Sequence, residues 1–538
     1  MRYQYRIVGI YTLLLCLFLG MCFRLSSVSS DQKVLQTAQS QGASLVRAVE
    51  SRGNIYDRNL TPLVNCPDED HPLYRAAVAP SSEALNLLSR YYDPQKLLTL
   101  MRQGKPFAIT LEKDMVYGKG IEIFPYVSRY SENQLAPHII GYINGAGEGV
   151  SGVELAFNDY LKDTGRTVDV RFQTDGVGTP FAGIAPEVEE VNADSREGLI
   201  LTLDSRIQTA AEQAMSGIAK GAAVVMDVET GDLLASVSAP AFQPTNLTAS
   251  LEDSDAPFVN RAFSAYNVGS TFKLVVAARA LEVGISPEES IVCTGTIEVG
   301  GQTFPCHFAQ GHGETNMLRG LEWSCNPYFI HLIQEIGGEG AAILASDIGF
   351  GRADVFCEGY KTAAGYLPAK EEFQNPAAEA NFGFGQGTLM ATPVQIAKLI
   401  SCIANGGEAV QARLIQGYAG IDGSVASYTP RYSRIRVMSE RTAALLKEYM
   451  IAVVESGSGQ LAKPDTGGAG GKTASAQTGQ YSGKGDERKE KVDAWFSGFY
   501  PAANPKYAIV VLAEGMESGS DYAAPVFQKI ANAIAQLE

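Results

Sequence analysis

Residues 269–281 read GSTFKLVVAARAL, and this stretch decides which fold and which site the chain predicts. From Leu274 onward nearly every residue is apolar, which predicts a helix buried in the middle of a domain. Ser270 would then lie at the N-terminus of that helix, with Lys273 one turn later on the same face. Free backbone N–H groups favour negative charge there, and a lysine of lowered pKa can accept the hydroxyl proton. The pair is a candidate activated serine nucleophile, although a serine N-cap beside a solvated lysine gives the same pattern.

Two later motifs complete a candidate site around Ser270. Ser324 and Asn326 stand in a turn that begins 54 positions after Ser270. If the turn is extended, both side chains point the same way and offer a hydroxyl that passes a proton and an amide that holds a lysine or a substrate carbonyl. Residues 470–476, GGKTASA, predict a glycine-rich approach to a strand that presents the cation of Lys472 and hydroxyl groups to the nucleophile.

Length, charge and ligand types limit the class of protein. With 538 residues the chain is too long for one compact core, so at least two domains are expected. A formal net charge of -16, with no basic stripe, argues against nucleic acid as a partner. The 5 histidines show no zinc-ligand spacing, and His307 and His312 have no third ligand nearby, so neither a metal nor another cofactor is expected. Cys293 and Cys306 either pair or remain free buried thiols.

The N-terminus predicts a membrane anchor. Residues 7–23 form an uncharged apolar run, just long enough to span a membrane, and Arg2 and Arg6 precede it. These arginines place residues 1–6 in the cytoplasm and everything after Arg24 outside the cell membrane. A signal peptide cleaved near residues 27–30 would look similar, but an uncleaved single-pass anchor is favoured because no Ala-x-Ala site follows.

The rest of the chain divides near the acidic segment 186–197. Residues 24–195 hold a polar stalk at 26–42 and a mixture of short strands and helices. Residues 196–538 predict an α/β (α+β) domain in which helices flank one antiparallel sheet and the Ser270 helix lies in the middle. The elements expected there are strands at 199–204, 222–227, 233–238, 494–500 and 507–513, and helices at 207–219 and 526–537.

The three motifs, in this order, resemble those of the penicillin-binding proteins and serine β-lactamases. Further segments resemble class B penicillin-binding proteins, so the resemblance covers nearly the whole chain. It implies a single transmembrane helix, a pedestal domain of the dimerisation kind and a penicillin-recognising transpeptidase domain. The segments that carry it are the anchor, Arg52–Arg58, His138–Glu154, Thr202–Asp204, Gly383–Gln395 and Ala494–Phe499.

What the resemblance implies is D,D-transpeptidation, the cross-linking of peptidoglycan outside the membrane, with β-lactams as covalent inhibitors. Ser270 would attack the carbonyl of the penultimate D-Ala of a stem peptide, release the terminal D-Ala, and pass the acyl group to an amine on a neighbouring stem. Lys273 would be the base, kept neutral by burial and by the nearby cation of Lys472. Ser324 would relay the proton to the leaving nitrogen, and Asn326 would orient Lys273 or the substrate amide.

The strand motif would recognise the end of the stem peptide. Lys472, Thr473 and Ser475 would bind the terminal carboxylate. The backbone N–H groups of Ser270 and Ser475 would form the oxyanion hole. The family motif has glycine where this chain has Ala474, whose methyl group would narrow the gap through which substrate pairs with the strand. We interpret this as a tuned and still active site.

Two other functions remain open. A β-lactam hydrolase or sensor would share the acylating serine, but a hydrolase needs a base for the deacylating water, and the sequence offers no candidate. A catalytically weak scaffold of the wall-synthesis complex is disfavoured because the site residues are complete. The resemblance also implies a polytopic glycosyltransferase of the shape, elongation, division and sporulation group as a partner, bound through the anchor and pedestal.

Overall fold

The computed structural model describes residues 2–29, 42–113, 118, 120–193, 195–428, 434–482, 489–516 and 519–538. Contacts between residues divide the chain into two compact units. Unit 1 comprises residues 1–52, 65–129 and 164–195, and unit 2 comprises residues 53–64, 130–163 and 196–538. The chain therefore passes between the units several times, whereas the sequence suggested one division near residue 195.

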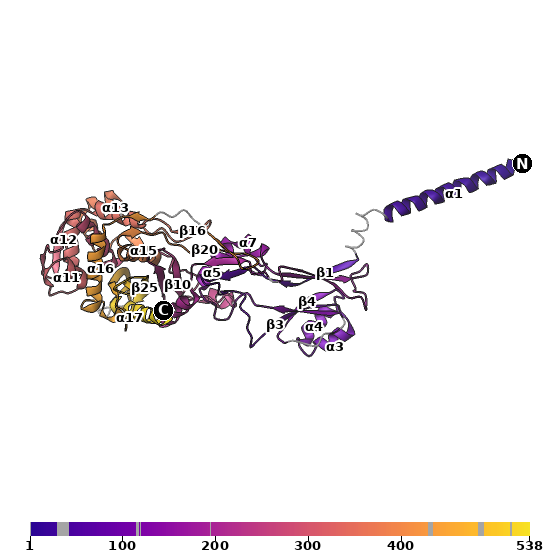
Figure 1. Cartoon of the computed structure of the whole chain (residues 1–538), viewed down its shortest axis with the longest axis horizontal. Helices are drawn as coiled ribbons and strands as arrows, with labels where there is room; N and C mark the ends of the chain where they lie inside the picture. Colours follow the sequence, from indigo (N-terminus) through magenta and orange to yellow (C-terminus); the bar gives the residue numbers. More distant parts are fainter. Residues whose placement is uncertain are drawn as a thin grey trace. The chain divides into compact units, whose positions relative to one another are not determined.

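Helix α1 (Arg2–Ser29) is the one candidate membrane span in the part of the chain that the structure describes (Figure 1). Its mean hydropathy reaches 2.1, and none of its apolar stretch is buried inside the protein. At a rise of about 1.5 Å per residue the helix exceeds the roughly 30 Å of a bilayer's hydrocarbon core. The helix thus extends beyond the predicted run 7–23 at both ends. Most of the predicted stalk, and Ser30 of the alternative cleavage segment, lie outside the described residues.

Unit 1 contains two three-stranded antiparallel sheets, of order β1-β6-β7 and β4-β3-β5. Alternate residues of β6 are buried, as expected for a strand with one solvated face. Val168 and Val170 of β6 share an apolar cluster with Ala77 of β3, so the two sheets have a common core. The elements of unit 1 after α1 are β1 (Ala43–Glu50), β3 (Leu73–Val78), α3 (Ser82–Leu88), α4 (Pro94–Met101), β4 (Phe107–Leu111), β5 (Ile121–Tyr126), β6 (Thr167–Gln173) and β7 (Glu187–Val191).

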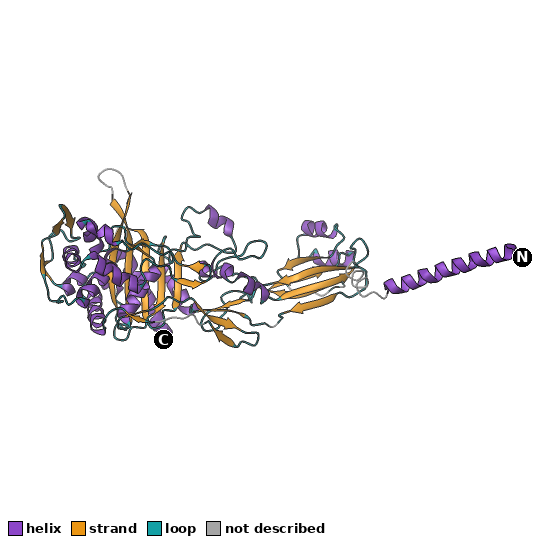
Figure 2. Cartoon of the chain, turned by 90° about the horizontal axis from the view of Figure 1, so that it is seen from above, coloured by secondary structure: helices purple, strands orange, loops and turns teal. Residues whose placement is uncertain are grey.

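The centre of unit 2 is a five-stranded antiparallel sheet of order β10-β9-β25-β24-β23, drawn in orange in Figure 2. Successive residues of each strand face opposite sides, so Val224 and Val510 join one apolar core while Val225 and Val511 join another. Strand β23 lies at the edge of the sheet. The strands are β9 (Gly221–Asp227), β10 (Leu233–Ala239), β23 (Gly470–Ser482), β24 (Lys489–Tyr500) and β25 (Tyr507–Met516).

Helices cover both faces of this sheet. Helices α8 (Ser205–Met215) and α17 (Gly519–Leu537) bury their apolar faces in one core. Helices α10 (Lys273–Glu282), α15 (Pro393–Ala404) and α16 (Glu440–Glu455) form the other core, with α15 buried along its whole length (Figure 1). The arrangement confirms the predicted α/β fold with helices flanking an antiparallel sheet.

One predicted strand is shorter than expected. The sequence suggested a strand at 199–204, but β8 (Gly198–Leu201) ends earlier because Asp204 is the N-cap of α8 and accepts a hydrogen bond from the Arg206 N–H at 3.0 Å. The buried Asp57 also holds this helix start, since its Oδ2 accepts from the Ser205 N–H at 3.1 Å and from the Ser205 hydroxyl at 2.8 Å. The early segment that resembles class B proteins thus supports the first helix of the sheet domain.

Smaller elements complete unit 2. A four-stranded sheet contains β2 (Asn54–Tyr56), β8, β20 (Ile415–Ala419) and β21 (Val425–Ser427). Paired strands are β11 (Tyr266–Asn267) with β18 (Met390–Ala391), β12 (Ile291–Cys293) with β15 (Gly313–Thr315), β13 (Thr296–Val299) with β14 (Gln302–Pro305), β16 (Val355–Cys357) with β17 (Tyr360–Lys361), and β19 (Glu408–Ala409) with β22 (Ile435–Arg436). The helices are α5 (Pro137–Ile140), α6 (Gly152–Ala156), α7 (Asn158–Asp163), α9 (Leu247–Glu252), α11 (Met317–Glu322), α12 (Asn326–Ile336), α13 (Gly338–Ile348) and α14 (Pro376–Gly383), with 3-10 turns η1 (Gly269–Phe272), η2 (Lys370–Gln374) and η3 (Gln460–Ala462).

Candidate active site

Ser270 lies on the 3-10 turn η1, directly before α10. The sequence suggested that the α-helix itself begins at Ser270, but it begins at Lys273. Gly269 adopts a φ of 60°, and its N–H donates to the Gly385 carbonyl at 2.9 Å. A Cβ on Gly385 would lie 1.9 Å from the Gly269 carbonyl oxygen, so the close approach of the two loops requires glycine. In 3-10 geometry residues i and i+3 eclipse each other, so Ser270 and Lys273 still share a face.

Ser270 opens onto a cavity of about 640 Å³ in unit 2. The structure brings the three sequence motifs together here. From the second motif Ser324 and Asn326 line the cavity, and from the strand motif Thr473, Ala474 and Ser475 do so. The two lysines of the motifs, Lys273 and Lys472, lie beneath the surface, and each is 0% exposed.

Lys273 joins the first motif to the second. Its Nζ donates to the Ser324 carbonyl at 2.7 Å, to the Ser324 hydroxyl at 3.1 Å and to the Asn326 Oδ1 at 2.8 Å. Ser324 adopts a φ of 56°, a left-handed conformation that is rare outside glycine and turns both its carbonyl and its hydroxyl toward the amine. Burial lowers the pKa of Lys273 to about 7. A substantial fraction of this amine is therefore neutral near neutral pH, as a proton acceptor must be.

Lys472 is a fully buried residue of strand β23 and does not line the cavity. Its Nζ donates to the Thr473 carbonyl at 3.0 Å. Burial, with a further contribution from the charge of Lys273, lowers the pKa of Lys472 well below its ordinary value. Burial is thus the main cause that lowers the pKa of each lysine, and two ammonium groups in one buried site would repel each other.

The strand motif lies on the edge strand of the sheet, where Lys472, Thr473 and Ala474 are buried and Ser475 is exposed. The Thr473 hydroxyl is 2.9 Å from that of Ser458, and both face the cavity. Ser475 is exposed and its carbonyl accepts from the Gln386 side chain at 3.4 Å. Ala474, where the family motif has glycine, is 3% exposed, lies opposite Trp495 in the strand register and belongs to the central apolar core. Its methyl group therefore contributes to packing of the edge strand as well as to the cavity wall.

Several further residues of this cavity were not predicted from the sequence. Ser458 follows α16 in a loop without a motif, and only its contact with Thr473 shows its place. Gln386 belongs to the glycine-rich stretch after α14, which was noted for its resemblance but given no role. Asn381, which also lines the cavity, stands on α14. Polar side chains that converge from distant loops have no shared sequence pattern.

A cluster of four candidate metal ligands was not predicted from the sequence either. Cys293, Cys306, His312 and Cys325 place one sulfur or nitrogen atom each within 4.8 Å of all the others. The expectation that no metal is bound rested on the spacing of the histidines and on one pair of cysteines. It did not include Cys325 as a further ligand. Neither Cys293 nor Cys306 forms a disulfide. Of the two states left open for this pair, the structure has the free thiols.

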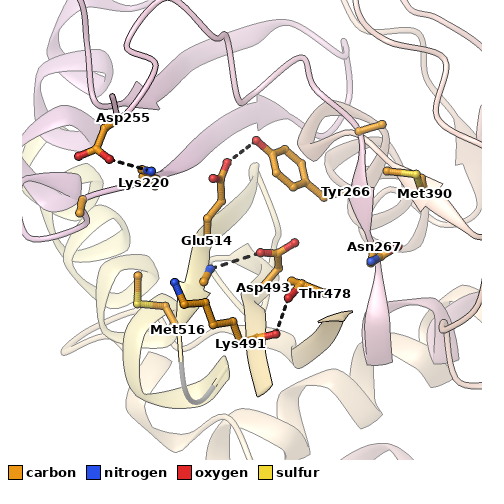
Figure 3. A pocket seen from close by; sticks show the side chains of 13 residues that line it. Lys220, Asp255, Tyr266, Asn267, Met390, Thr478, Lys491, Asp493, Glu514 and Met516 are labelled. Carbon is orange, nitrogen blue, oxygen red and sulfur yellow. Dashed lines mark hydrogen bonds and ion pairs between the residues drawn. The ribbon is translucent and has the colours of Figure 1, made fainter. Parts of the chain in front are cut away.

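A second cavity of about 560 Å³ lies where strands β24 and β25 approach Tyr266 (Figure 3). Its acidic groups have partners: Asp255 pairs with Lys220 at 2.8 Å, and Glu514 accepts from the Tyr266 hydroxyl at 2.5 Å. Asp493 accepts from the Gly515 N–H at 3.4 Å. Because these acidic groups already have partners and the three motifs meet elsewhere, the Ser270 cavity is the better candidate for an active site.

Comparisons with known proteins agree with this site. Residues 221–532, more than half of the chain, match the penicillin binding protein transpeptidase domain. The chain is 29% identical to stage V sporulation protein D of Bacillus subtilis over 426 residues, which cover 75% of this chain and 63% of that protein. It is 31% identical to penicillin-binding protein PbpB of Mycobacterium tuberculosis over 435 residues, 76% of this chain and 62% of that protein. The chain thus spans less than two thirds of the length of these two relatives.

A third relative is covered more fully. The chain is 31% identical to peptidoglycan D,D-transpeptidase PbpA of M. tuberculosis over 380 residues, 64% of this chain and 74% of that protein. Among solved structures, the D,D-transpeptidase domain of a peptidoglycan glycosyltransferase from Eggerthella lenta has the same fold, with a TM-score of 0.64, 24% identity, and coverage of 91% of this chain and 99% of that chain. A chain of a peptidoglycan synthase complex gives a TM-score of 0.70 at 24% identity, covering 98% and 99%. The chain belongs to the penicillin-binding protein transpeptidase family.

Proposed function

We propose that this protein is a serine D,D-transpeptidase that cross-links peptidoglycan stem peptides. The Ser270 Oγ attacks the carbonyl carbon of the penultimate D-Ala and loses its proton, the peptide bond to the terminal D-Ala breaks, and that D-Ala leaves as the free amine. The acyl group on Ser270 then passes to an amine of a second stem peptide, and the serine regains a proton. Penicillin would acylate the same oxygen. The observation that carries the proposal is the buried Lys273 amine, three residues after Ser270, held against Ser324 and Asn326.

The lysine contacts support a route for the proton. A neutral Lys273 takes the proton of Ser270, for which its lowered pKa is suited. The Ser324 hydroxyl, 3.1 Å from the same nitrogen, passes a proton to the leaving nitrogen. Asn326 fixes the amine from a third direction through its Oδ1. Three contacts leave the amine little freedom to rotate away from the serine.

The strand residues support carboxylate recognition. The hydroxyls of Thr473 and Ser475 face the cavity, and we assign them to the terminal carboxylate of the stem peptide. We assign the buried Lys472 of the same strand to this carboxylate as well, because a bound anion would favour the charged form of the lysine. The backbone N–H groups of Ser270 and Ser475 are assigned to the oxyanion hole, where one donor is worth about 3 kcal/mol in the transition state.

We further propose that α1 anchors the protein in the cell membrane once, with unit 2 outside, and that residues 24–195 act as stalk and pedestal. The arginines before the apolar run support this orientation. We also propose a polytopic glycosyltransferase of the shape, elongation, division and sporulation group as the partner. Two structures of similar fold support an assembly of this kind, since one belongs to a peptidoglycan synthase complex that coordinates polymerization with crosslinking and another is a complex of PBP2 with MreC from Helicobacter pylori.

The function is tested with the full-length protein in detergent, given a peptide donor that ends in D-Ala-D-Ala and an amine acceptor. Mass spectrometry should show the cross-linked product and free D-Ala. Ser270→Ala should abolish both, while Ser216→Ala, at an exposed helix end, should leave them unchanged. Release of donor acid without cross-link would show a hydrolase, and no turnover by a folded protein would show a scaffold; either result would refute the proposal.

A further inference from the structure

Four side chains with metal-binding atoms converge next to the catalytic lysine. Cys293 ends β12, Cys306 follows β14, and His312 precedes β15. Cys325 comes from the second catalytic motif, at the N-cap of α12. The four ligand atoms all lie within 4.8 Å of one another. Three thiols and one imidazole are a ligand set typical of structural zinc sites.

The distances between ligand atoms fit one tetrahedral ion. The His312 Nδ1 lies 3.5 Å from the Cys306 sulfur and 3.8 Å from the Cys293 sulfur. Bonds of about 2.3 Å from zinc to sulfur and about 2.05 Å to nitrogen, at tetrahedral angles, would separate sulfur from nitrogen by about 3.6 Å. The cluster therefore already has nearly the edge length that a bound zinc ion would impose.

The three thiols are buried, as they are in a structural centre, and His312 is half-buried. Cys293, Cys306 and Cys325 are 2%, 6% and 0% exposed, and none of them forms a disulfide. Buried thiols on an extracytoplasmic domain would be open to oxidation whenever the domain loosens, unless a metal binds them. A different acidic trio, Glu289, His331 and Glu335, is largely exposed and has no thiol, so it lacks these properties.

The loops that carry the ligands are held together by backbone contacts. The Cys306 N–H donates to the Gly295 carbonyl at 2.8 Å. Gly311 has a φ of 77°, and a Cβ there would lie 2.2 Å from the Cys293 carbonyl oxygen. The small β12–β15 and β13–β14 ladders complete the frame. The ligands are thus brought together by the fold itself and not only by one another.

We propose that Cys293, Cys306, His312 and Cys325 bind one zinc ion, with His312 coordinating through Nδ1. Zinc suits the set because it prefers tetrahedral sulfur and nitrogen ligands and undergoes no redox change. The three thiols lose their protons when the ion binds, and no electron is transferred. With four protein ligands the ion has no open position, so its role is structural and not catalytic.

The zinc ion would stabilise the catalytic motif from both sides. Cys325 stands between Ser324 and Asn326, whose oxygens hold the Lys273 amine. The Asn326 Nδ2 also donates to the Pro305 carbonyl at 3.2 Å, next to Cys306. One ion would therefore tie the cavity wall at residues 305–306 to the turn that positions the catalytic lysine. Loss of zinc should loosen this turn and slow acylation of Ser270.

Metal content is the direct test. Full-length protein is purified in detergent without chelators, exposed to zinc, and then washed with a chelator of moderate affinity that removes ions held by exposed carboxylates. Elemental mass spectrometry should find about one zinc per chain. Cys293→Ser should reduce this more than tenfold, His312→Cys should retain it because a thiolate replaces the imidazole, and the matched control Cys357→Ser should equal the wild type. Cys357 is a half-buried free cysteine on β16, away from the four ligands.

Cobalt gives a second measurement that does not depend on any variant folding. Wild-type protein loaded with Co²⁺ should show the intense visible bands of a tetrahedral site and sulfur-to-cobalt charge transfer. Acylation by a fluorescent penicillin should fall together with zinc content. Three results would overturn the proposal: less than about one zinc per ten chains in the wild type, octahedral cobalt spectra without charge transfer, or a disulfide-linked peptide that joins two of the four positions.

Discussion

Replacing Lys273 by methionine tests the claim that its amine is forced toward the neutral state by burial. The substitution keeps an unbranched side chain and removes the one titrating group. Burial lowers the pKa of Lys273 from 10.5 to about 7, a shift that corresponds to about 5 kcal/mol at about 1.4 kcal/mol per unit. Between these two pH values the unfolded chain binds a proton that the folded chain does not, so this group makes the wild type more stable as pH rises.

The stability of the Lys273→Met variant lacks this contribution. From pH 7.5 to 9.5 the unfolding free energy of the wild type should therefore rise relative to the variant by about 3 kcal/mol. Thermal unfolding followed by tryptophan fluorescence should show a wild-type gain of at least a few degrees. Lys361→Met, at an exposed lysine on β17, is the control and should give no pH-dependent difference. A constant difference between wild type and Lys273→Met, or acylation of that variant by penicillin, would refute the reasoning.

Four further results are expected. The acylation rate of the wild type should rise as pH increases through about 7, because the proposed base is the neutral form of Lys273, and a rate independent of pH from 5 to 9 would exclude that role. Ala474→Gly should leave acylation within a few-fold or raise it while stability falls by about 1–2 kcal/mol, since a buried methyl is lost; a large loss of acylation would show that the methyl positions the strand. Lys472→Ala should lower the acylation rate about tenfold or more, and an unchanged rate would remove it from carboxylate recognition. Protease added to spheroplasts should digest everything outside α1, and protection of unit 2 would contradict the proposed orientation.

The predictable part of the fold was carried by short local apolar patterns. The strands at 222–227 and 233–238 appear as β9 and β10 with almost the predicted bounds, because each is a short and almost continuous apolar run beside a turn, the pattern of a strand that is buried on both faces. The helix at 207–219 was placed within a few residues, since its start depends on the Asp204 cap. By contrast, residues 53–64 and 130–163 belong to unit 2 although they stand among segments of unit 1 in the sequence. No local sequence pattern shows to which unit such a segment belongs.

The site shows the same division between local pattern and distant contact. The motifs located Ser270, Lys273 and the residues around Ser324, because each motif is a short pattern of reactive side chains. The complete burial of Lys472 on β23 was not predictable, since the sequence does not show which side of an edge strand faces the core. The four-ligand cluster was not predicted for a further reason. Its members are far apart in the sequence, and the last of them, Cys325, is part of the Ser324 motif.

Trapping the acyl-enzyme tests the central claim most directly. Full-length protein is mixed with a D-Ala-D-Ala donor, quenched in acid and digested with trypsin, and the peptide that spans residues 262–273 is sequenced by tandem mass spectrometry. The account predicts the donor acyl group, less its terminal D-Ala, on Ser270 and on neither Ser264 nor Thr271 of the same peptide. An acyl group on any other residue, or none on a folded protein that still consumes the donor, would contradict it.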